Sequence, residues 1–145
     1  MKVRFVALAF VAATSLGSFP GTQSHAATFT VTNTSDSGPG SLRQAVQDAN
    51  SNFRDASRIE FNIPGSGVHT IILAAGNTLI ASRPVTIDGF TQPGSKPNSL
   101  TEGIDAVLLI QLRGELRVLD DCVVRGLAIN TSPATGLTLQ GSGCD

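Results

Sequence analysis

The chain has 145 residues, a length typical of one globular domain. Hydrophobic residues make up 41% and charged residues 14%, well below the ~25% charge of an average globular protein, so a disordered charged tail is excluded. The net charge of -1 argues against a nucleic-acid partner, because proteins that bind nucleic acid usually carry a stripe of basic residues. The 15 glycines and 7 prolines favour many turns between short strands over a helical bundle.

The N-terminal segment, residues 1–26, has the layout of a secretory signal peptide. Lys2 and Arg4 supply the positive start, and the apolar run that follows is shorter than the ~20 residues needed to span a bilayer. The small residues Ser24 and Ala26 occupy the two positions that a signal peptidase reads, so cleavage is expected after Ala26. The protein is therefore predicted to be exported, either secreted or held at the cell surface.

The rest of the chain, residues 27–145, is predicted to be one domain. It contains no apolar run of ~18 residues, so no transmembrane helix is expected. Residues 28–33 alternate polar and apolar side chains, which predicts a half-buried strand. Further short runs, separated by Gly, Asp, Asn or Ser, predict more strands at residues 58–63, 70–73, 78–80, 84–87, 106–112, 116–119, 122–124, 127–130 and 137–140.

One helix is predicted, over residues 42–49. Ser41 precedes it and Gln44 follows three residues later, which is the pattern of a capping box. The apolar residues that repeat at helical spacing are Leu42, Ala45, Val46 and Ala49. An isolated helix of this length is marginal in water, so it must pack on an apolar surface.

Several of the short runs resemble one another. Residues 85–89 (VTIDG) resemble residues 122–126 (CVVRG), and residues 116–119 (LRVL) resemble residues 137–140 (LTLQ). The spacing of the second pair, from Leu116 to Leu137, suggests a regular repeat. A period of about 22 residues fits one coil of a parallel β-helix, in which a coil cannot bury its apolar side alone and stacks on the next.

Four segments resemble the start of bacterial right-handed parallel β-helix repeat proteins with the pectin-lyase-like fold. They are FTVTNTSDSGPGSLRQAVQDAN, RIEFNIPGSGVHTI, PVTIDGFTQPG and CVVRGLAIN, in the family's order, and they cover most of residues 29–140. The resemblance implies an all-β protein: a short right-handed single-stranded parallel β-helix of about four coils, with an α-helix capping its N-terminal end. It implies no single activity, because members range from polysaccharide lyases and hydrolases to adhesins and surface proteins.

The C-terminal end of this β-helix is predicted to be uncapped, because no helix signal follows residues 137–140. Family members usually continue for many more coils. An open end exposes apolar side chains and unpaired backbone. Three interpretations stay open: a truncated reading frame, a fragment of a longer gene, or a unit that self-associates through this end.

Cys122 and Cys144 are separated along the chain by about one coil. Stacked strands are ~4.8 Å apart, and a disulfide needs Cα atoms ~4.4–6.8 Å apart. The sequence therefore predicts either stacked buried thiols or a disulfide between coils, the latter in keeping with an oxidising compartment. A metal or redox role is disfavoured, because there is no C-x-x-C motif and no histidine nearby. The family often has Asn or Ser at these positions.

Asp120 and Asp121 form the only carboxylate doublet, and a solvated turn is the favoured interpretation. Neighbouring strand residues point to opposite faces, so the two make a poor acid–base or Ca²⁺ site. A lyase of this fold would resemble the family in using an Arg or Lys base and Ca²⁺ held by several Asp. The candidates are then the cations Arg113, Arg117 and Arg125, and the ligands Asp88, Asp120 and Asp121. Asp88 precedes Gly89, which predicts a turn instead, so no catalytic residue or cofactor is assigned.

The leading hypothesis is a secreted or cell-surface β-helix module with a structural or binding role, towards a polysaccharide or another surface. The alternative is a polysaccharide lyase or hydrolase, or its remnant, and only that alternative calls for Ca²⁺. A groove lined by several carboxylates with a cation opposite would distinguish the two. The side chains predicted to be buried are Leu42, Val46, Phe61, Ile87 and Ile129.

Overall fold

The structure is a computed structural model that describes residues 26–53, 55–119, 121–130 and 136–140. Residues 1–25 of the predicted signal peptide lie outside these ranges. Among the described residues, no helix has both the length and the apolar character needed to cross a membrane.

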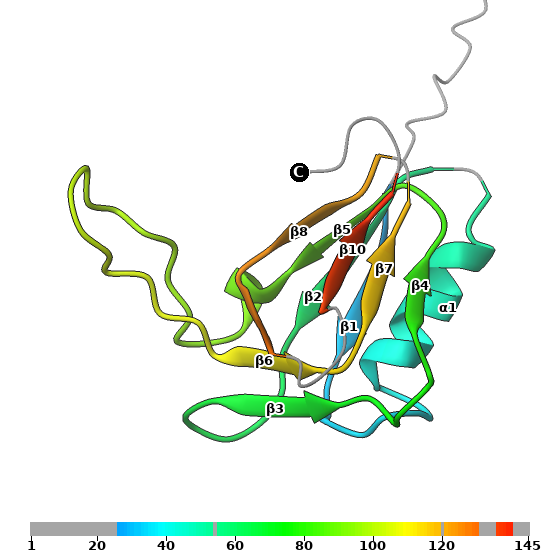
Figure 1. Cartoon of the computed structure of the whole chain (residues 1–145), viewed down its shortest axis with the longest axis horizontal. Coiled ribbons are helices and arrows are strands. Elements are labelled where there is room, and N and C mark those ends of the chain that lie inside the picture. The colour runs from blue at the N-terminus through cyan, green and yellow to red at the C-terminus, as the bar shows by residue number, and fades with distance from the viewer. Residues whose placement is uncertain (1–25, 54, 120, 131–135, 141–145) are drawn as a thin grey trace, which may run out of the picture.

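Ten described strands form three sheets, each with parallel strands throughout (Figure 1). Sheet A has the order β1 (Ala27–Val31), β2 (Ser57–Phe61), β5 (Val85–Asp88) and β8 (Val123–Arg125). Sheet B has the order β3 (His69–Ile72), β6 (Ile110–Arg113) and β9 (Leu127–Asn130). Sheet C has the order β4 (Leu79–Ala81), β7 (Leu116–Val118) and β10 (Leu137–Leu139). The prediction that the chain folds mainly into β-strands is confirmed.

After β1 the chain visits sheets A, B and C in the same order three times. The three passages are β2–β3–β4, β5–β6–β7 and β8–β9–β10. Each strand of the second and third passages pairs in parallel with its equivalent in the passage before. Two neighbouring strands that run in the same direction need a long connection between them. The connection here consists of the other two strands of the passage.

The sequence similarities between runs correspond to strand neighbours. Ile87 lies opposite Val124, and Leu116 lies opposite Leu137, as the paired runs predict. The prediction of a uniform period is wrong, however. The stretch of chain from Ile110 to its partner Leu127 is less than half as long as the stretch from His69 to its partner Ile110. The strands keep register while the connections between them vary in length.

The core is formed by the inward side chains of the three sheets and by the apolar face of the helix. Four residues predicted to be buried are buried: Leu42, Val46, Phe61 and Ile87. The prediction for Ile129 is wrong, because this side chain is only partly buried. Ile129 belongs to β9, the last strand of sheet B, and no described strand stacks on its free side.

The helix α1 (Leu42–Ser51) begins as the sequence predicts, with Ser41 as its N-cap. The Ser41 hydroxyl accepts a hydrogen bond from the Gln44 backbone N–H at 3.2 Å. The second half of the predicted capping box is absent, because the Ser41 N–H donates to the Gly38 carbonyl and the Gln44 amide donates to Asp48. The cap therefore satisfies one helix N–H with a side chain and leaves Gln44 to bond along the helix.

α1 packs against β1, β2 and β4, so it covers the first strands of sheets A and C (Figure 1). The Asn50 side chain donates to the Ile80 carbonyl and accepts from the Ser82 N–H, both at 2.8 Å. It thus bonds the free edge of β4 as a neighbouring strand would. The helix shields sheet edges that would otherwise be open to another chain.

A long loop, residues 92–109, projects from the sheets between β5 and β6 (the yellow-green segment in Figure 1). The predicted strand over residues 106–112 forms only from Ile110 onward. Upstream of it, Val107 makes an isolated antiparallel bridge with Lys96. The Asp105 carboxylate accepts hydrogen bonds from Lys96 at 2.5 Å and from the Ser99 backbone at 2.7 Å. Polar contacts within the loop therefore replace sheet pairing in this segment.

The hydrogen bonds from Lys96 and then from Ser99 lower the pKa of Asp105 to about 2 from its usual 3.8. Because the pKa of the folded state lies below that of the unfolded state, the contribution of Asp105 to stability is present above pH 3.8 and is lost as the pH falls through about 2. We expect a carboxyl NMR titration to place its midpoint near 2. Lys96→Ala should move that midpoint upward, whereas Thr101→Val should leave it in place.

Candidate functional site

Asp88 is the last residue of β5 and the N-cap of the short 3-10 helix η1 (Gly89–Thr91). Its Oδ1 accepts a hydrogen bond from the Phe90 N–H at 3.2 Å. The side chain is only 3% exposed, although strand alternation places it on the outward face of sheet A, opposite to Ile87. The turn predicted after Asp88 is confirmed, but its burial was not foreseen.

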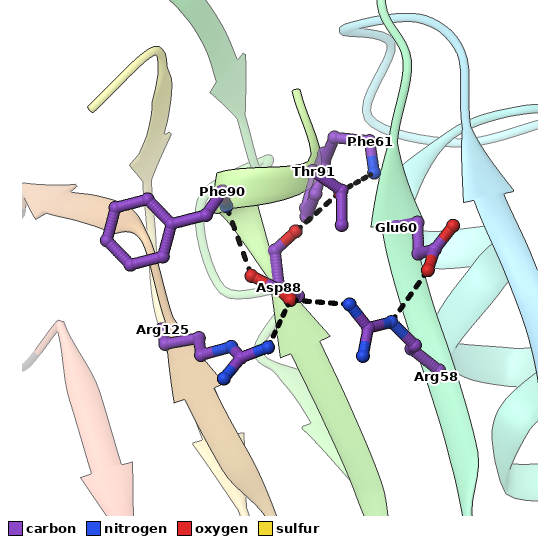
Figure 2. A network of polar contacts seen from close by, with 7 residues as sticks. All are labelled: Arg58, Glu60, Phe61, Asp88, Phe90, Thr91 and Arg125. Carbon is purple, nitrogen blue, oxygen red and sulfur yellow. Dashed lines mark hydrogen bonds and ion pairs between the residues drawn. The ribbon is translucent and has the colours of Figure 1, made fainter. Parts of the chain in front are cut away.

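Two arginines reach the same oxygen of Asp88 from neighbouring strands (Figure 2). Arg58 on β2 donates to Oδ2 at 2.7 Å, and Arg125 on β8 donates to it at 2.6 Å. Arg58 also donates to Glu60 of its own strand at 2.6 Å. The register explains this cluster, because Asp88 lies directly opposite Glu60 on one side and Arg125 on the other. The Asp88 network, these four side chains, links three adjacent strands of sheet A.

Two further side chains attach the segment after Asp88 to strand β2 and the residues that follow it. The Thr91 hydroxyl donates to the Asp88 carbonyl and accepts from the Phe61 N–H, both at 2.7 Å. The buried Gln92 amide accepts from the Ile63 N–H at 2.9 Å and donates to the Ile63 carbonyl at 2.8 Å. Gln92 thus continues the parallel ladder past the end of β2 and fixes the base of the loop that begins there.

The electrostatics of the Asp88 network favour structural cross-linking over catalysis. The Asp88 carboxylate raises the pKa of Arg125 above its usual value, by a hydrogen bond and by Coulomb attraction, so this guanidinium stays charged. Two guanidinium groups beside Asp88 oppose binding of a cation such as Ca²⁺ there. With 3% of its side chain exposed, Asp88 also offers little surface to a substrate.

The structure separates most of the other candidate site residues. Arg113 lies on β6 in sheet B and Arg117 on β7 in sheet C, so these cations do not share a face with Arg125. Asp121 is exposed in a turn and has a left-handed φ of 56°, which agrees with the predicted solvated turn. Asp120 lies outside the described residues. Among the described residues there is no group of three or more His, Cys, Asp or Glu side chains placed to hold a metal ion.

Cys122 is buried, as the stacking hypothesis requires, and its thiol lies 3.2 Å from the Arg83 carbonyl. Its predicted partner, Cys144, lies outside the described residues. Disulfide and stacked thiols therefore both remain predictions.

A groove lies between β1 and α1, beside the Asp88 network on the outward side of sheet A. Thr28 and Thr30 form its wall on β1 and are exposed, and they lie opposite Arg58 and Glu60 of β2. The described residues that line the groove are Thr28, Phe29, Thr30, Gly40, Ser41, Gln44, Ala45 and Asp48. A single carboxylate among hydroxyl and amide groups offers hydrogen bonds to a neutral polar ligand and lacks the paired carboxylates of a hydrolase.

Comparisons with known proteins bring no relative: no protein-family model matches the chain, and neither the curated proteins nor the solved structures searched match it. The interpretation of this protein therefore rests on its own residues and geometry.

Replacing Asp88 with Asn should lower the free energy of unfolding by about 2 kcal/mol, the scale of hydrogen bonds to a charged group after allowance for the partly exposed arginines. Denaturant unfolding measures this loss. Asp36→Asn is the matched control, because Asp36 pairs with one arginine, Arg43, and is 30% exposed. The control should cost less than ~1 kcal/mol. Equal losses in the two variants would contradict a special role for Asp88.

Proposed function

We propose that the protein is an exported right-handed parallel β-helix module that binds a polysaccharide or another surface component and does not act as an enzyme. The repeated A–B–C order of the three parallel sheets supports a β-helix, as does the resemblance of four segments to that family. α1 takes the part of the N-terminal cap. The signal layout of residues 1–26 supports export.

The observation that favours a binding role over an enzymatic one is the set of hydrogen bonds that the Asp88 carboxylate accepts. Its two oxygens are occupied by two arginines and a backbone N–H, so the candidate Ca²⁺ ligand of the lyase alternative holds strands together instead. On β1, which β2 separates from Asp88, the exposed hydroxyls of Thr28 and Thr30 open onto the groove beside α1. These hydroxyls on the sheet and the Gln44 amide on α1 suit the many hydrogen bonds of a sugar chain.

Calorimetric titration with polygalacturonate and with cello-oligosaccharides tests this function. We expect binding of at least one of these probes, weakened fivefold or more by the double variant Thr28→Val and Thr30→Val, which removes hydroxyls without changing volume. Thr101→Val on the projecting loop is the matched control and should bind as the wild type does. Binding that the double variant leaves unchanged would place the ligand elsewhere.

The same mixtures separate a binding module from an enzyme. Release of unsaturated uronides or of new reducing ends, lost in Asp88→Asn, would overturn the proposal in favour of the lyase or hydrolase alternative.

Export is tested separately. Mass spectrometry of protein from the culture medium should find Ala27 or Thr28 at the N-terminus. Protein that keeps Met1 and stays in the cell would contradict export.

A further inference from the structure

The charge of the groove between β1 and α1 is set by one carboxylate. Among the described residues that line the groove, Asp48 is the only one that is charged, and its side chain is partly buried. Two arginines adjoin the lining residues, one in sequence and one across the sheet, and both are already paired. Arg43 donates to Asp36 at 2.8 Å, and Arg58 donates to two carboxylates of the Asp88 network. The negative charge of Asp48 therefore has no cation opposite it in the groove.

The groups that a ligand would meet in the groove are mostly hydrogen-bond acceptors. The Gln44 amide donates to Oδ1 of Asp48 at 2.8 Å. This bond leaves the Gln44 carbonyl oxygen and Oδ2 of Asp48 as acceptors that have no partner among the described residues. The exposed hydroxyls of Thr28 and Thr30 can either donate or accept. A ligand that fits these groups must supply hydrogen-bond donors as well as acceptors.

The N-terminal turn of α1 borders the same groove, and a helix N-terminus ordinarily favours an anion. Here the Ser41 hydroxyl accepts a hydrogen bond from the Gln44 N–H and donates to the Gly38 carbonyl at 2.7 Å. The cap thus occupies the place that an anion would take at this N–H. The helix end therefore does not offset the carboxylate of Asp48.

These features distinguish between classes of sugar chain. A sugar hydroxyl both donates and accepts, so it can pair with every free group of the groove. The carboxylate of a uronic acid only accepts, and its negative charge is repelled by Asp48. The ammonium group of an amino sugar could pair with Asp48, but one partly exposed ion pair contributes little to binding.

We propose that the groove selects an uncharged glycan over an acidic one. This inference rests on the proposed function, because it concerns the ligand of the same groove. The groove has a volume of about 190 Å³, less than the ~300–1,000 Å³ of pockets that enclose a whole ligand. The glycan therefore lies across the surface with a short stretch of its chain in the groove.

Oligogalacturonates of a single length, in methyl-esterified and in free-acid form, test this selectivity because the ester removes the negative charges and keeps the sugar chain. In calorimetric titrations at low salt, the wild type should bind the ester roughly fivefold or more tightly than the free acid. Cello-oligosaccharides should also bind more tightly than the free acid. The difference should shrink at high salt, which screens the repulsion by Asp48.

Asp48→Asn removes the charge from the groove and should reduce the preference for the ester by about threefold or more. Glu102→Gln is the matched control, because it removes the same charge from an exposed position on the projecting loop. The control should keep the preference of the wild type.

The outcomes separate this inference from the proposed function. A wild type that binds the free acid as tightly as the ester would overturn the selectivity and leave the binding role in place. The same holds if Asp48→Asn keeps the full preference, or if chitosan oligosaccharides bind more tightly than cello-oligosaccharides. Absence of binding to every probe, or binding that the double variant Thr28→Val and Thr30→Val leaves unchanged, would contradict the proposed function of the groove itself.

Discussion

Replacing Val46 with Asp is expected to lower the free energy of unfolding by about 3–5 kcal/mol, the cost of an unpaired charge in an apolar core. Val46 lies in the middle of α1, is 1% exposed and belongs to the core that the helix shares with the sheets. The chain cannot move an Asp at this position into water without lifting the helix from β1, β2 and β4. Thermal and denaturant unfolding both measure the loss.

Gln47→Asp is the matched control for this variant. It introduces the same residue at the next position of the same helix, where the side chain is exposed. Gln47→Asp loses some helix propensity and Val46→Asp hardly any, so a larger loss in Val46→Asp reports the cost of burial. A Val46→Asp protein as stable as the Gln47→Asp protein would show that α1 does not cover the core.

Alternation of side chains predicted most of this architecture, because an inward apolar residue at every second position is what a one-sided strand requires. The similarity of VTIDG and CVVRG goes further, since it places Asp88 opposite Arg125 in the correct register. Arg58 was missed, because SRIEF and VTID share only an isoleucine followed by an acidic residue, Ile59 opposite Ile87 and Glu60 opposite Asp88, and so short a match was not used to align them. A further signal was that Arg58 and Glu60 lie on the face opposite Ile59 and Phe61.

The segment at residues 106–112 shows where pattern reading fails. Val107 and Leu108 are apolar, so they resemble a buried strand, but they lie in the projecting loop and are 41% and 37% exposed. Hydrophobicity indicates that a side chain can be buried, but the projecting loop has no core on which these two side chains could pack. The base of that loop is set by the side chain of Gln92, which bonds Ile63 from far along the chain, and no local pattern contains such a contact.

Gly126→Ala is expected to lower the free energy of unfolding by about 3 kcal/mol, through two separate causes. Gly126 has a φ of +71°, which costs an L-residue ~1 kcal/mol. A Cβ here would also lie 2.5 Å from the Phe90 backbone nitrogen, and overpacking of a rigid site adds ~1–3 kcal/mol. The clash falls beside the Asp88 network, because the Phe90 N–H donates to the Asp88 carboxylate, which caps η1.

Gly76→Ala separates the two causes. Gly76 has a similar φ of +78°, but a Cβ there would meet nothing within 4 Å, so only the conformational cost of ~1 kcal/mol should appear. The excess loss in Gly126→Ala then measures the close approach of neighbouring strand ends. Gly89 meets Gly126 from the other side, since a Cβ on Gly89 would overlap the Gly126 carbonyl oxygen. If Gly126→Ala and Gly76→Ala unfold with the same loss, the strands have room to separate here, and the repeated glycine after Asp88 and Arg125 is not needed for their contact.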